Sequence, residues 1–481
     1  MVSILILMSF EVSMILGTGV NGSTPLWSGK CGDSLNCGCT SLSGPDRCDE
    51  LEQVWMLELE VDPSSEPFTK FIAVGPDGMV LASWKTMLGS FNVEKKIALW
   101  ELRMEEGDII TSPTVFPLPR EAHPEIVPFC FGTSEGNLFG YSYQSDKRPE
   151  LDWATSFPNG VRYLQSDNSG RRLYVGTVAD SKGSGHFYIV DTATGGIMWS
   201  SEENLIANPA VTSLGDVVVT ATLSGVVASY ISTTTDGQLI VTTMWNQEGV
   251  LSSASPAIAV EEDVVFIVRV DGRLSCLDLD TGDILWEFST NMYPLFSPSI
   301  SFANNDSLVV VGPHAVIGIS SNGLIEWNHT FSYDTRLAGP ATCDAGGYIW
   351  VGVSGSLSVY VFDAEGNLHT TSQEVYCSKC TVDPHVASSI VLASSRRVAY
   401  LLQTNALTLT TLDMECLDFS LEFIKKATVL GAVGFAAITV CIVMVLLRFK
   451  KVKRTTTISQ PDDDDGATQS LVRPASIYGS Y

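Results

Sequence analysis

Apolar and polar residues alternate in a strand-like pattern over most of the chain, with a longer apolar run near each end. Stretches rich in Val, Ile and Tyr, such as VVVTATLSGVVASYI, VVFIVRVDGRLSCLDL and YIWVGVSGSLSVYVF, are broken at strand-length intervals by Gly, Asp, Asn or Ser. β-Branched and aromatic residues favour strands, whereas the small and polar residues between them favour turns. The pattern therefore predicts an all-β domain of short antiparallel strands.

Tryptophan marks a repeat within this strand-rich region. Seven tryptophans are separated by 45, 53, 46, 46, 41 and 41 residues: Trp55, Trp100, Trp153, Trp199, Trp245, Trp286 and Trp327. A proline preceded by a small or polar residue recurs in step, at positions 113, 209, 256, 298 and 340. A unit of about 40–50 residues with three or four strands, repeated around an axis, is typical of a β-propeller.

The best-preserved copies of the repeat are DTATGGIMW (191–199) and DLDTGDILW (278–286). Asp and Thr cap a tight turn in which Gly adopts a backbone conformation that other residues resist. The strand that follows carries the tryptophan, whose large surface can pack between adjacent blades. We therefore expect the seven tryptophans to dock blades together rather than to take part in catalysis.

The Asp-x-x-Thr-Gly-x-x-x-Trp pattern resembles the repeat of the quinoprotein-dehydrogenase-like propellers, which are typically eight-bladed. Six repeats separate Trp55 from Trp327, and a seventh ends near Thr370 without a tryptophan. Residues 386–412 are strand-rich but lack a closing motif, whereas the strand around Trp55 is a closing motif without strands before it. Pairing the two would complete an eighth blade and remove two unpaired sheet edges. We expect an eight-bladed propeller over residues 50–415, closed by its N- and C-terminal strands.

The two ends of the chain predict a membrane protein. Residues 427–447 form 21 consecutive uncharged residues, enough for a helix that crosses a bilayer. The denser basic cluster follows this run, which favours a cytoplasmic, disordered tail over residues 448–481. Residues 1–22 resemble a signal peptide; the alternative, an uncleaved anchor, has only nine apolar residues before Glu11. The expected topology is single-pass, type I, in the plasma membrane, with a juxtamembrane stalk at 416–426.

Cysteines and glycosylation motifs fit an extracytoplasmic propeller. Ten of the 11 cysteines precede the apolar run, and an even number allows full pairing. The disulfide candidates are Cys31, Cys37, Cys39 and Cys48, in a Cys-rich segment at 23–49, and Cys377 with Cys380. A zinc site in the first group and redox activity in the second are the weaker alternatives. Asn305 and Asn328 lie in N-glycosylation motifs.

Charge and motif content narrow the function. The tail from Arg448 carries six basic and four acidic residues, so the rest of the chain carries −26 − 2 = −28. This excludes nucleic acid as the expected partner. The six histidines show no metal-binding spacing, and no Cys-Cys pair, nucleophile elbow or phosphate loop is present. We expect no catalytic residue, no metal and no cofactor.

Three functional classes remain. The first is a receptor-like surface protein whose propeller binds an extracellular protein or other ligand. The others are a membrane-anchored quinone- or calcium-dependent dehydrogenase and a scaffold for membrane proteins in cis. A signal peptide, such a propeller, one span and a short tail together resemble the Gamete Expressed 3 family of plant membrane proteins. That resemblance implies a role in gametophyte function and pollen-tube guidance. Among the long loops, residues 105–125 and 180–185 are candidates for ligand contact.

Overall fold

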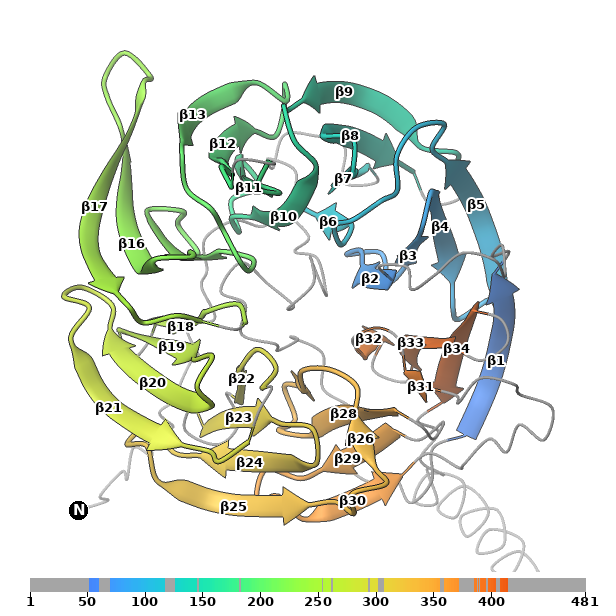
Figure 1. Cartoon of the computed structure of the whole chain (residues 1–481). Coiled ribbons are helices and arrows are strands. Elements are labelled where there is room, and N and C mark those ends of the chain that lie inside the picture. Colours follow the sequence, from blue (N-terminus) through green and yellow to red (C-terminus); the bar gives the residue numbers. More distant parts are fainter. Residues whose placement is uncertain are drawn as a thin grey trace, which may run out of the picture. The chain divides into compact units, whose positions relative to one another are not determined.

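The computed structural model describes residues 52–59 and 70–413, except 117–125, 145–146, 181–182, 253, 261–262, 293–294, 302–306, 355–358, 372–384, 387, 389, 395–396 and 404–406. The elements formed by these residues are β-strands, arranged as blades around a central axis (Figure 1). The predicted signal peptide, Cys-rich segment, stalk, span and tail lie outside the described residues. No helix in the described part is long and apolar enough to cross a membrane.

Six blades are four-stranded antiparallel meanders whose strands, from the axis outward, we call a, b, c and d. Blade 1 contains β2 (Lys70–Val74), β3 (Val80–Trp84), β4 (Met87–Asn92) and β5 (Ile97–Arg103). Blade 2 contains β6 (Thr114–Val115), β7 (Val127–Gly132), β8 (Asn137–Tyr143) and β9 (Glu150–Ser156). Blade 3 contains β10 (Val161–Ser166), β11 (Arg172–Thr177), β12 (Phe187–Asp191) and β13 (Ile197–Ser201). Blade 4 contains β14 (Ala210–Val211), β15 (Val217–Ala221), β16 (Gly225–Thr233) and β17 (Leu239–Glu248).

The meander continues through blades 5 and 6. Blade 5 contains β18 (Ala257–Ala259), β19 (Val264–Val268), β20 (Arg273–Asp278) and β21 (Ile284–Ser289). Blade 6 contains β22 (Ser299–Ser301), β23 (Ser307–Val311), β24 (Ala315–Ile319) and β25 (Ile325–Thr330). Blade 7 contains β27 (Thr342–Cys343), β28 (Ile349–Ser354), β29 (Val359–Phe362) and β30 (Leu368–Thr371).

The eighth blade is built from both ends of the described chain. Its strands a, b and c are β32 (Val391–Ser394), β33 (Arg397–Gln403) and β34 (Leu407–Asp413), and its strand d is β1 (Glu52–Leu59). β1 runs antiparallel to β34, with Trp55 opposite Thr411 and Leu57 opposite Leu409. The predicted count of eight blades and the predicted closure are therefore confirmed for the described residues. Because β1 pairs with β34, neither the first nor the last strands of the propeller remain as an incomplete blade.

Blades 7 and 8 share additional pairing. β31 (His385–Val386) pairs with β28 of blade 7 and with β33 of blade 8. β26 (Arg336–Leu337) also pairs with β28 in antiparallel fashion, with Leu337 opposite Val353. A hydrogen bond of 2.6 Å from the Thr342 hydroxyl to the Ile390 carbonyl also crosses this boundary near the axis. These bonds join the two blades into one ten-stranded sheet.

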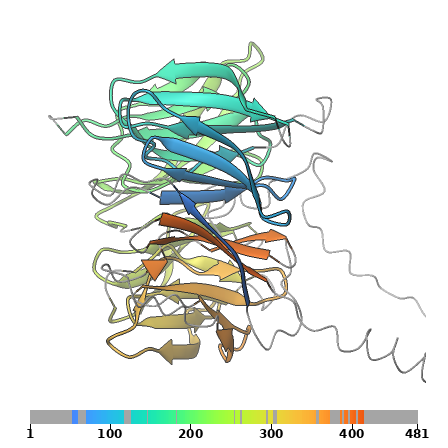
Figure 2. The ribbon, with the colours of Figure 1, turned by 90° about the vertical axis from the view of Figure 1, so that its right-hand side faces the viewer.

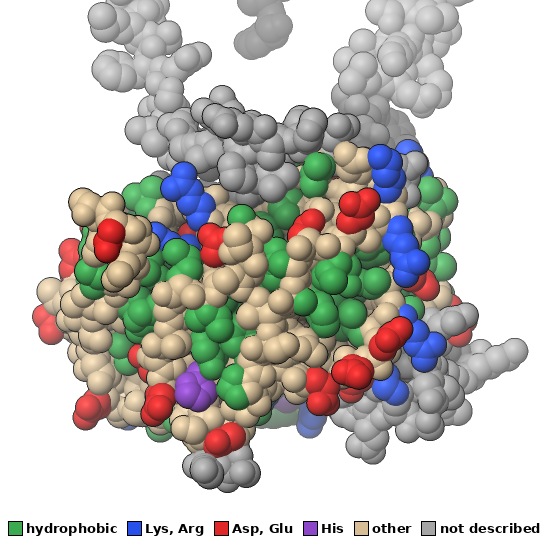
Figure 3. Space-filling view, turned by 90° about the horizontal axis from the view of Figure 1, so that it is seen from above, with side chains coloured by type: hydrophobic (Ala, Val, Ile, Leu, Met, Phe, Trp, Pro, Cys, Tyr) green, Lys and Arg blue, Asp and Glu red, His purple; other side chains and the backbone are tan. Residues whose placement is uncertain are grey.

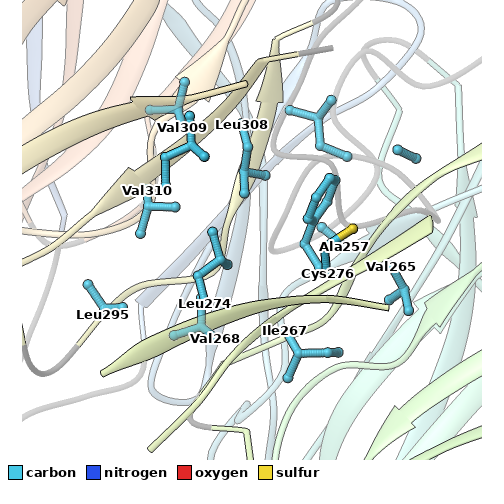
Figure 4. Packing of buried hydrophobic residues seen from close by; sticks show 14 of the residues in the cluster. Ala257, Val265, Ile267, Val268, Leu274, Cys276, Leu295, Leu308, Val309 and Val310 are labelled. Carbon is cyan, nitrogen blue, oxygen red and sulfur yellow. The ribbon is translucent and has the colours of Figure 1, made fainter. Parts of the chain in front are cut away.

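The hydrophobic core lies between neighbouring blades. One cluster of buried side chains runs through blades 4 to 7, and Figure 4 shows part of it, including Val268 and Leu274 of blade 5 and Leu308, Val309 and Val310 of blade 6. Because each blade buries both faces against its neighbours, strands b are apolar throughout, as VVFIV in β19 and SLVVV in β23 illustrate. The ring is therefore held mainly by contacts between blades.

Full pairing of the ten cysteines that precede residue 427 is wrong. Cys130 and Cys343 are free and buried, in blades 2 and 7, and Cys276 is buried in blade 5. Cys276 lies among the apolar side chains of the core, close to Ala257 (Figure 4). Burial raises the pKa of the Cys130 and Cys343 thiols, so they behave as small apolar side chains. The six disulfide candidates lie outside the described residues.

Candidate functional site

Four of the predicted docking tryptophans hold the next blade through one recurring hydrogen bond. Each indole nitrogen donates to a backbone carbonyl in the turn between strands c and d of the following blade. The pairs are Trp153 with Thr192 (2.7 Å), Trp245 with Leu279 (2.7 Å), Trp286 with Ser321 (2.8 Å) and Trp327 with Ala364 (3.2 Å). A tryptophan therefore belongs to one blade and docks on the turn of the next.

The Asp-x-x-Thr-Gly turn is the receiving half of this contact. In blade 5 the Asp278 carboxylate accepts from the Thr281 amide at 2.7 Å and the Thr281 hydroxyl at 2.9 Å. Gly282 has a φ of +76°, and a Cβ there would lie 2.6 Å from the Trp245 ring. Glycine is required both for the left-handed backbone and for the approach of the indole. The motif thus specifies the turn that accepts one indole and, eight residues after its Asp, the tryptophan that donates to the next blade.

The other three tryptophans pack into hydrophobic clusters between blades. Trp100 is 7% exposed and stacks on Phe129 of blade 2 at 5.9 Å, but its indole nitrogen has no hydrogen-bond partner in the described structure. Trp199 meets Phe187 edge-on at 5.9 Å in the cluster between blades 3 and 4. Trp55 packs on the core of blade 1. All seven tryptophans lie in strand d of their blade.

Each tryptophan directly follows a β-bulge. In blade 5, Trp286 faces Cys276 and Ile284 faces Leu277, so Leu285 is the extra residue. The same irregularity recurs in every blade, with the extra residue at 54, 99, 152, 198, 244, 285, 326 and 369. A bulge bends the strand and re-aims the side chain after it. This explains how one position of the repeat turns toward the next blade each time.

Blade 7 has Thr370 at the tryptophan position, opposite Val361 and next to its bulge. The following blade explains the substitution. Strands c and d of blade 8 come from opposite ends of the chain, so no c–d turn exists there to receive an indole. The pairing of β31 with both blades takes the place of the docking contact.

The propeller has two loop-bearing faces of different construction (Figure 2). Because the strands are antiparallel, the a–b and c–d turns lie on one face, which we call the turn face. The b–c turns and the connections from strand d to the next strand a lie on the other, which we call the loop face. β1 begins at Glu52, opposite Asp413 at the end of β34, and β33 begins opposite the same residue. Glu52 and Asp413, the first and last described residues of this blade, therefore both lie at its turn face.

On the loop face, backbone hydrogen bonds tie the connections between blades to the b strands and b–c turns of the adjoining blades. Between blades 1 and 2, the Ile109 amide donates to the Lys85 carbonyl at 2.7 Å and the Ile110 amide donates to the Gly132 carbonyl at 3.0 Å. Equivalent bonds link Val178 to Gly160, Ile206 to Ala221, Val270 to Leu251, Phe296 to Val311 and Leu337 to Pro313. The loop face is consequently a rigid platform rather than a set of independent loops.

Residues 180–185, one of the loops expected to contact ligand, lie on this face as the b–c connection of blade 3. The Asn204 side chain, in the connection to blade 4, donates to the Gly183 carbonyl at 2.8 Å and accepts from the Gly185 amide. The other expected loop, 105–125, is not one loop. Residues 105–113 lie on the loop face, β6 then crosses the blade, and 117–125 lie outside the described residues.

Exposed side chains on the loop face include apolar and acidic groups. Leu223 is 61% exposed in the b–c turn of blade 4, Val270 is 43% exposed in blade 5, and Tyr333 is 90% exposed between blades 6 and 7. Exposed acidic residues over blades 1 to 4 are Glu105, Glu106, Asp108, Glu135 and Glu202. In blade 5, Arg269 and Arg273 pair with Asp271 and Glu287.

The turn face carries buried carboxyls with structural partners. Asp167, in the a–b turn of blade 3, is 1% exposed and accepts from the Ser169 hydroxyl at 2.8 Å and the Arg171 amide at 3.1 Å. Burial raises the pKa of this carboxyl, although those hydrogen bonds and Arg172 act in the opposite direction. Arg172 also donates to the Gly215 carbonyl of blade 4 at 2.9 Å. These groups join blades 3 and 4.

Metal-binding side chains do not cluster in the described part of the chain. No group of three or more His, Cys, Asp or Glu side chains there could hold a metal ion. The side chains of innermost strands β6, β14, β18 and β27 are buried. Of the two predicted glycosylation sites, Asn328 is exposed on β25 and Asn305 lies outside the described residues.

Comparisons with known proteins support the fold. The family model described as outer membrane protein assembly factor BamB matches residues 183–342, about a third of the chain. BamB from Moraxella catarrhalis is 14% identical, with a TM-score of 0.53 over 76% of this chain and 99% of that one. Quinohemoprotein alcohol dehydrogenase from Comamonas testosteroni is 10% identical, with a TM-score of 0.59 over 81% and 80%.

A europium-containing methanol dehydrogenase is 9% identical, with a TM-score of 0.58 over 82% of this chain and 98% of that one. No curated protein matches the sequence. At these identities the likeness concerns the fold: an eight-bladed propeller of the quinoprotein type.

Proposed function

We propose that this chain is a non-enzymatic, single-pass plasma-membrane protein whose propeller binds a protein ligand through its loop face. The observation that carries the proposal is the asymmetry of the two faces. Glu52 and Asp413, the first and last described residues of blade 8, both lie at its turn face, so the proposed C-terminal anchor would follow on that side. The loop face would then be available to a ligand, and backbone hydrogen bonds hold its turns and connections together. Preorganisation of this kind lowers the entropic cost of binding.

The proposed ligand is a protein surface that combines apolar and basic groups. Leu223, Val270 and Tyr333 supply exposed apolar area. The acidic side chains over blades 1 to 4 favour a basic partner and would speed its approach. By resemblance to the Gamete Expressed 3 family, the biological setting is the plant gametophyte and pollen-tube guidance.

A scaffold in cis is the second candidate. It is favoured by the match to the family described as outer membrane protein assembly factor BamB. The dehydrogenase alternative draws on the titles of the alcohol and methanol dehydrogenases of similar fold. A quinone bound to the purified protein, or dye-linked dehydrogenase activity, would support that alternative.

Two leucines of blade 4 provide a matched test of the loop face. Leu223 lies in the b–c turn and Leu214, 80% exposed, lies in the a–b turn on the turn face. The secreted propeller, residues 23–416, would be titrated onto intact pollen-tube and female gametophyte cells. We expect Leu223→Arg to weaken saturable binding at least tenfold and Leu214→Arg to leave it unchanged.

The reverse pattern would place the ligand on the turn face, and absence of saturable binding to any of these cells would contradict the receptor proposal. Cross-linking of the full-length protein on intact cells separates the two candidates. Products with membrane proteins of the same cell favour the scaffold, and products with a neighbouring cell favour the receptor.

A further inference from the structure

The outer strand of blade 6 contains a complete glycosylation motif in an accessible position. Asn328, His329 and Thr330 are the last residues of β25, opposite Ile317, Val316 and Ala315. Trp327 donates to blade 7, and the His329 ring lies 5.0 Å from Phe362 of that blade. Because side chains alternate along a strand, Asn328 and Thr330 point away from blade 7, and both are exposed. The side-chain amide of Asn328 makes no hydrogen bond among the described residues.

The rim beside this motif carries exposed apolar side chains. Leu324 and Ile325, at the start of β25, are 69% and 49% exposed, and Ile284 and Leu285 of β21 are 42% and 54% exposed. The bond from Trp286 to Ser321 brings β21 and the turn before β25 together, so the four residues belong to one region of the rim. Apolar side chains also reach the surface elsewhere on the rim (Figure 3). Leu151 on β9 and Ile197 on β13 are 53% and 50% exposed.

Exposed apolar groups beside an outer strand are a liability. The outer strand of each blade has one unpaired edge, and an apolar edge favours association with other chains. A bulky hydrophilic group on Asn328 would obstruct the free edge of β25 and cover the adjacent apolar rim.

We propose that Asn328 carries an N-linked glycan that shields the apolar rim of blades 5 and 6, formed by Ile284, Leu285, Leu324 and Ile325. In the modification, Nδ2 of Asn328 attacks the anomeric carbon of a lipid-pyrophosphate-linked oligosaccharide. The C–N bond forms as the C–O bond to pyrophosphate breaks, Nδ2 loses one proton and the lipid pyrophosphate leaves. The inference rests on the proposed extracytoplasmic position of the propeller, because the donor lipid is used there.

The chain offers a matched position for the test. Asn246 follows Trp245 just as Asn328 follows Trp327, and it is exposed on β17, but Gln247 and Glu248 do not complete a motif. Full-length protein from plant cells would be treated with peptide-N-glycosidase in heavy-oxygen water and analysed by peptide mass spectrometry.

We expect Asn328 to be converted to heavy-oxygen aspartate, with loss of the signal in Thr330→Ala and its retention in Thr330→Ser. We also expect Glu248→Thr to add a glycan at Asn246. An unoccupied Asn328 in chains glycosylated at another motif would overturn this inference and leave the proposed location intact. Chains without any glycan and without surface labelling on intact cells would overturn both.

A separate measurement tests whether the glycan shields the apolar rim. By light scattering of the secreted propeller, Asn328→Gln should associate as concentration rises, whereas Asn246→Gln should behave as the unchanged protein does. Adding Leu285→Lys and Leu324→Lys to Asn328→Gln should restore the monomer. If Asn328→Gln stays monomeric, the glycan does not shield the rim.

Discussion

Two tryptophans allow the docking hydrogen bond to be separated from the burial of the indole. Trp245 and Trp100 are both 7% exposed and both lie in strand d after a bulge. The Trp245 indole donates to the Leu279 carbonyl at 2.7 Å, whereas the buried Trp100 indole nitrogen has no hydrogen-bond partner among the described residues. Replacement of each by Phe removes the N–H and a similar volume from both sites.

The cost of the two replacements should differ. Trp245→Phe leaves the Leu279 carbonyl, in a residue 6% exposed, without its donor, which costs about 1–3 kcal/mol. Trp100→Phe removes a donor that has no acceptor, so no such penalty arises. The volume lost is similar in both, and Phe at position 100 keeps an aromatic ring to stack on Phe129. We therefore expect Trp245→Phe to lower the free energy of unfolding by about 1–3 kcal/mol more than Trp100→Phe.

Urea unfolding of the propeller, followed by circular dichroism so that the lost indole does not affect the signal, measures this difference. A Trp100→Phe protein that loses as much stability as Trp245→Phe, or more, would refute the role assigned to the hydrogen bond.

Three further predictions concern the turns, the buried carboxyl and the thiols. Gly282→Ala should be clearly more destabilising than Gly237→Ala, because both glycines have positive φ but only at Gly282 would a Cβ meet the Trp245 ring; thermal unfolding of both proteins checks this. The raised pKa of Asp167 means that the folded state holds its proton more tightly, so this carboxyl's contribution to stability is lost as pH rises from its unfolded value of 3.8 through its folded pKa. Urea unfolding across pH 3–8 should therefore show Asp167→Asn gaining relative to the unchanged protein as pH rises, and a constant difference would contradict this. Iodoacetamide should modify three thiols only after unfolding, and labelling in the native protein would contradict their burial: Cys130, Cys276 and Cys343.

The spacing of tryptophans was sufficient to predict the blade count and the closure, because the repeat reports one position per blade. It could not show which blade receives each indole. The receiving carbonyls, such as that of Leu279, belong to turns about 35 residues later, and backbone carbonyls leave no mark on a sequence. The bulge before each tryptophan could not be predicted from the sequence either. Its only sign there is the constant number of residues between the Asp of the turn and the tryptophan.

Other features needed the three-dimensional arrangement. The missing tryptophan at Thr370 is explained only once the outer strand of blade 8 is known to come from the N-terminal end. The even cysteine number suggested full pairing, but Cys130, Cys276 and Cys343 are separated into three blades, where apolar neighbours surround them. Sequence position also could not assign loops to faces, which is why residues 105–125 looked like a single loop.

Hydrogen–deuterium exchange of the secreted propeller, with and without its captured ligand, tests the central claim most directly. The loop-face account predicts that ligand slows exchange in the b–c turns and blade connections, at residues 178–186, 202–209, 222–224 and 269–272, and leaves the c–d turns at 192–196, 279–283 and 320–324 unchanged. Protection of the c–d turns without protection of the loop face would contradict it.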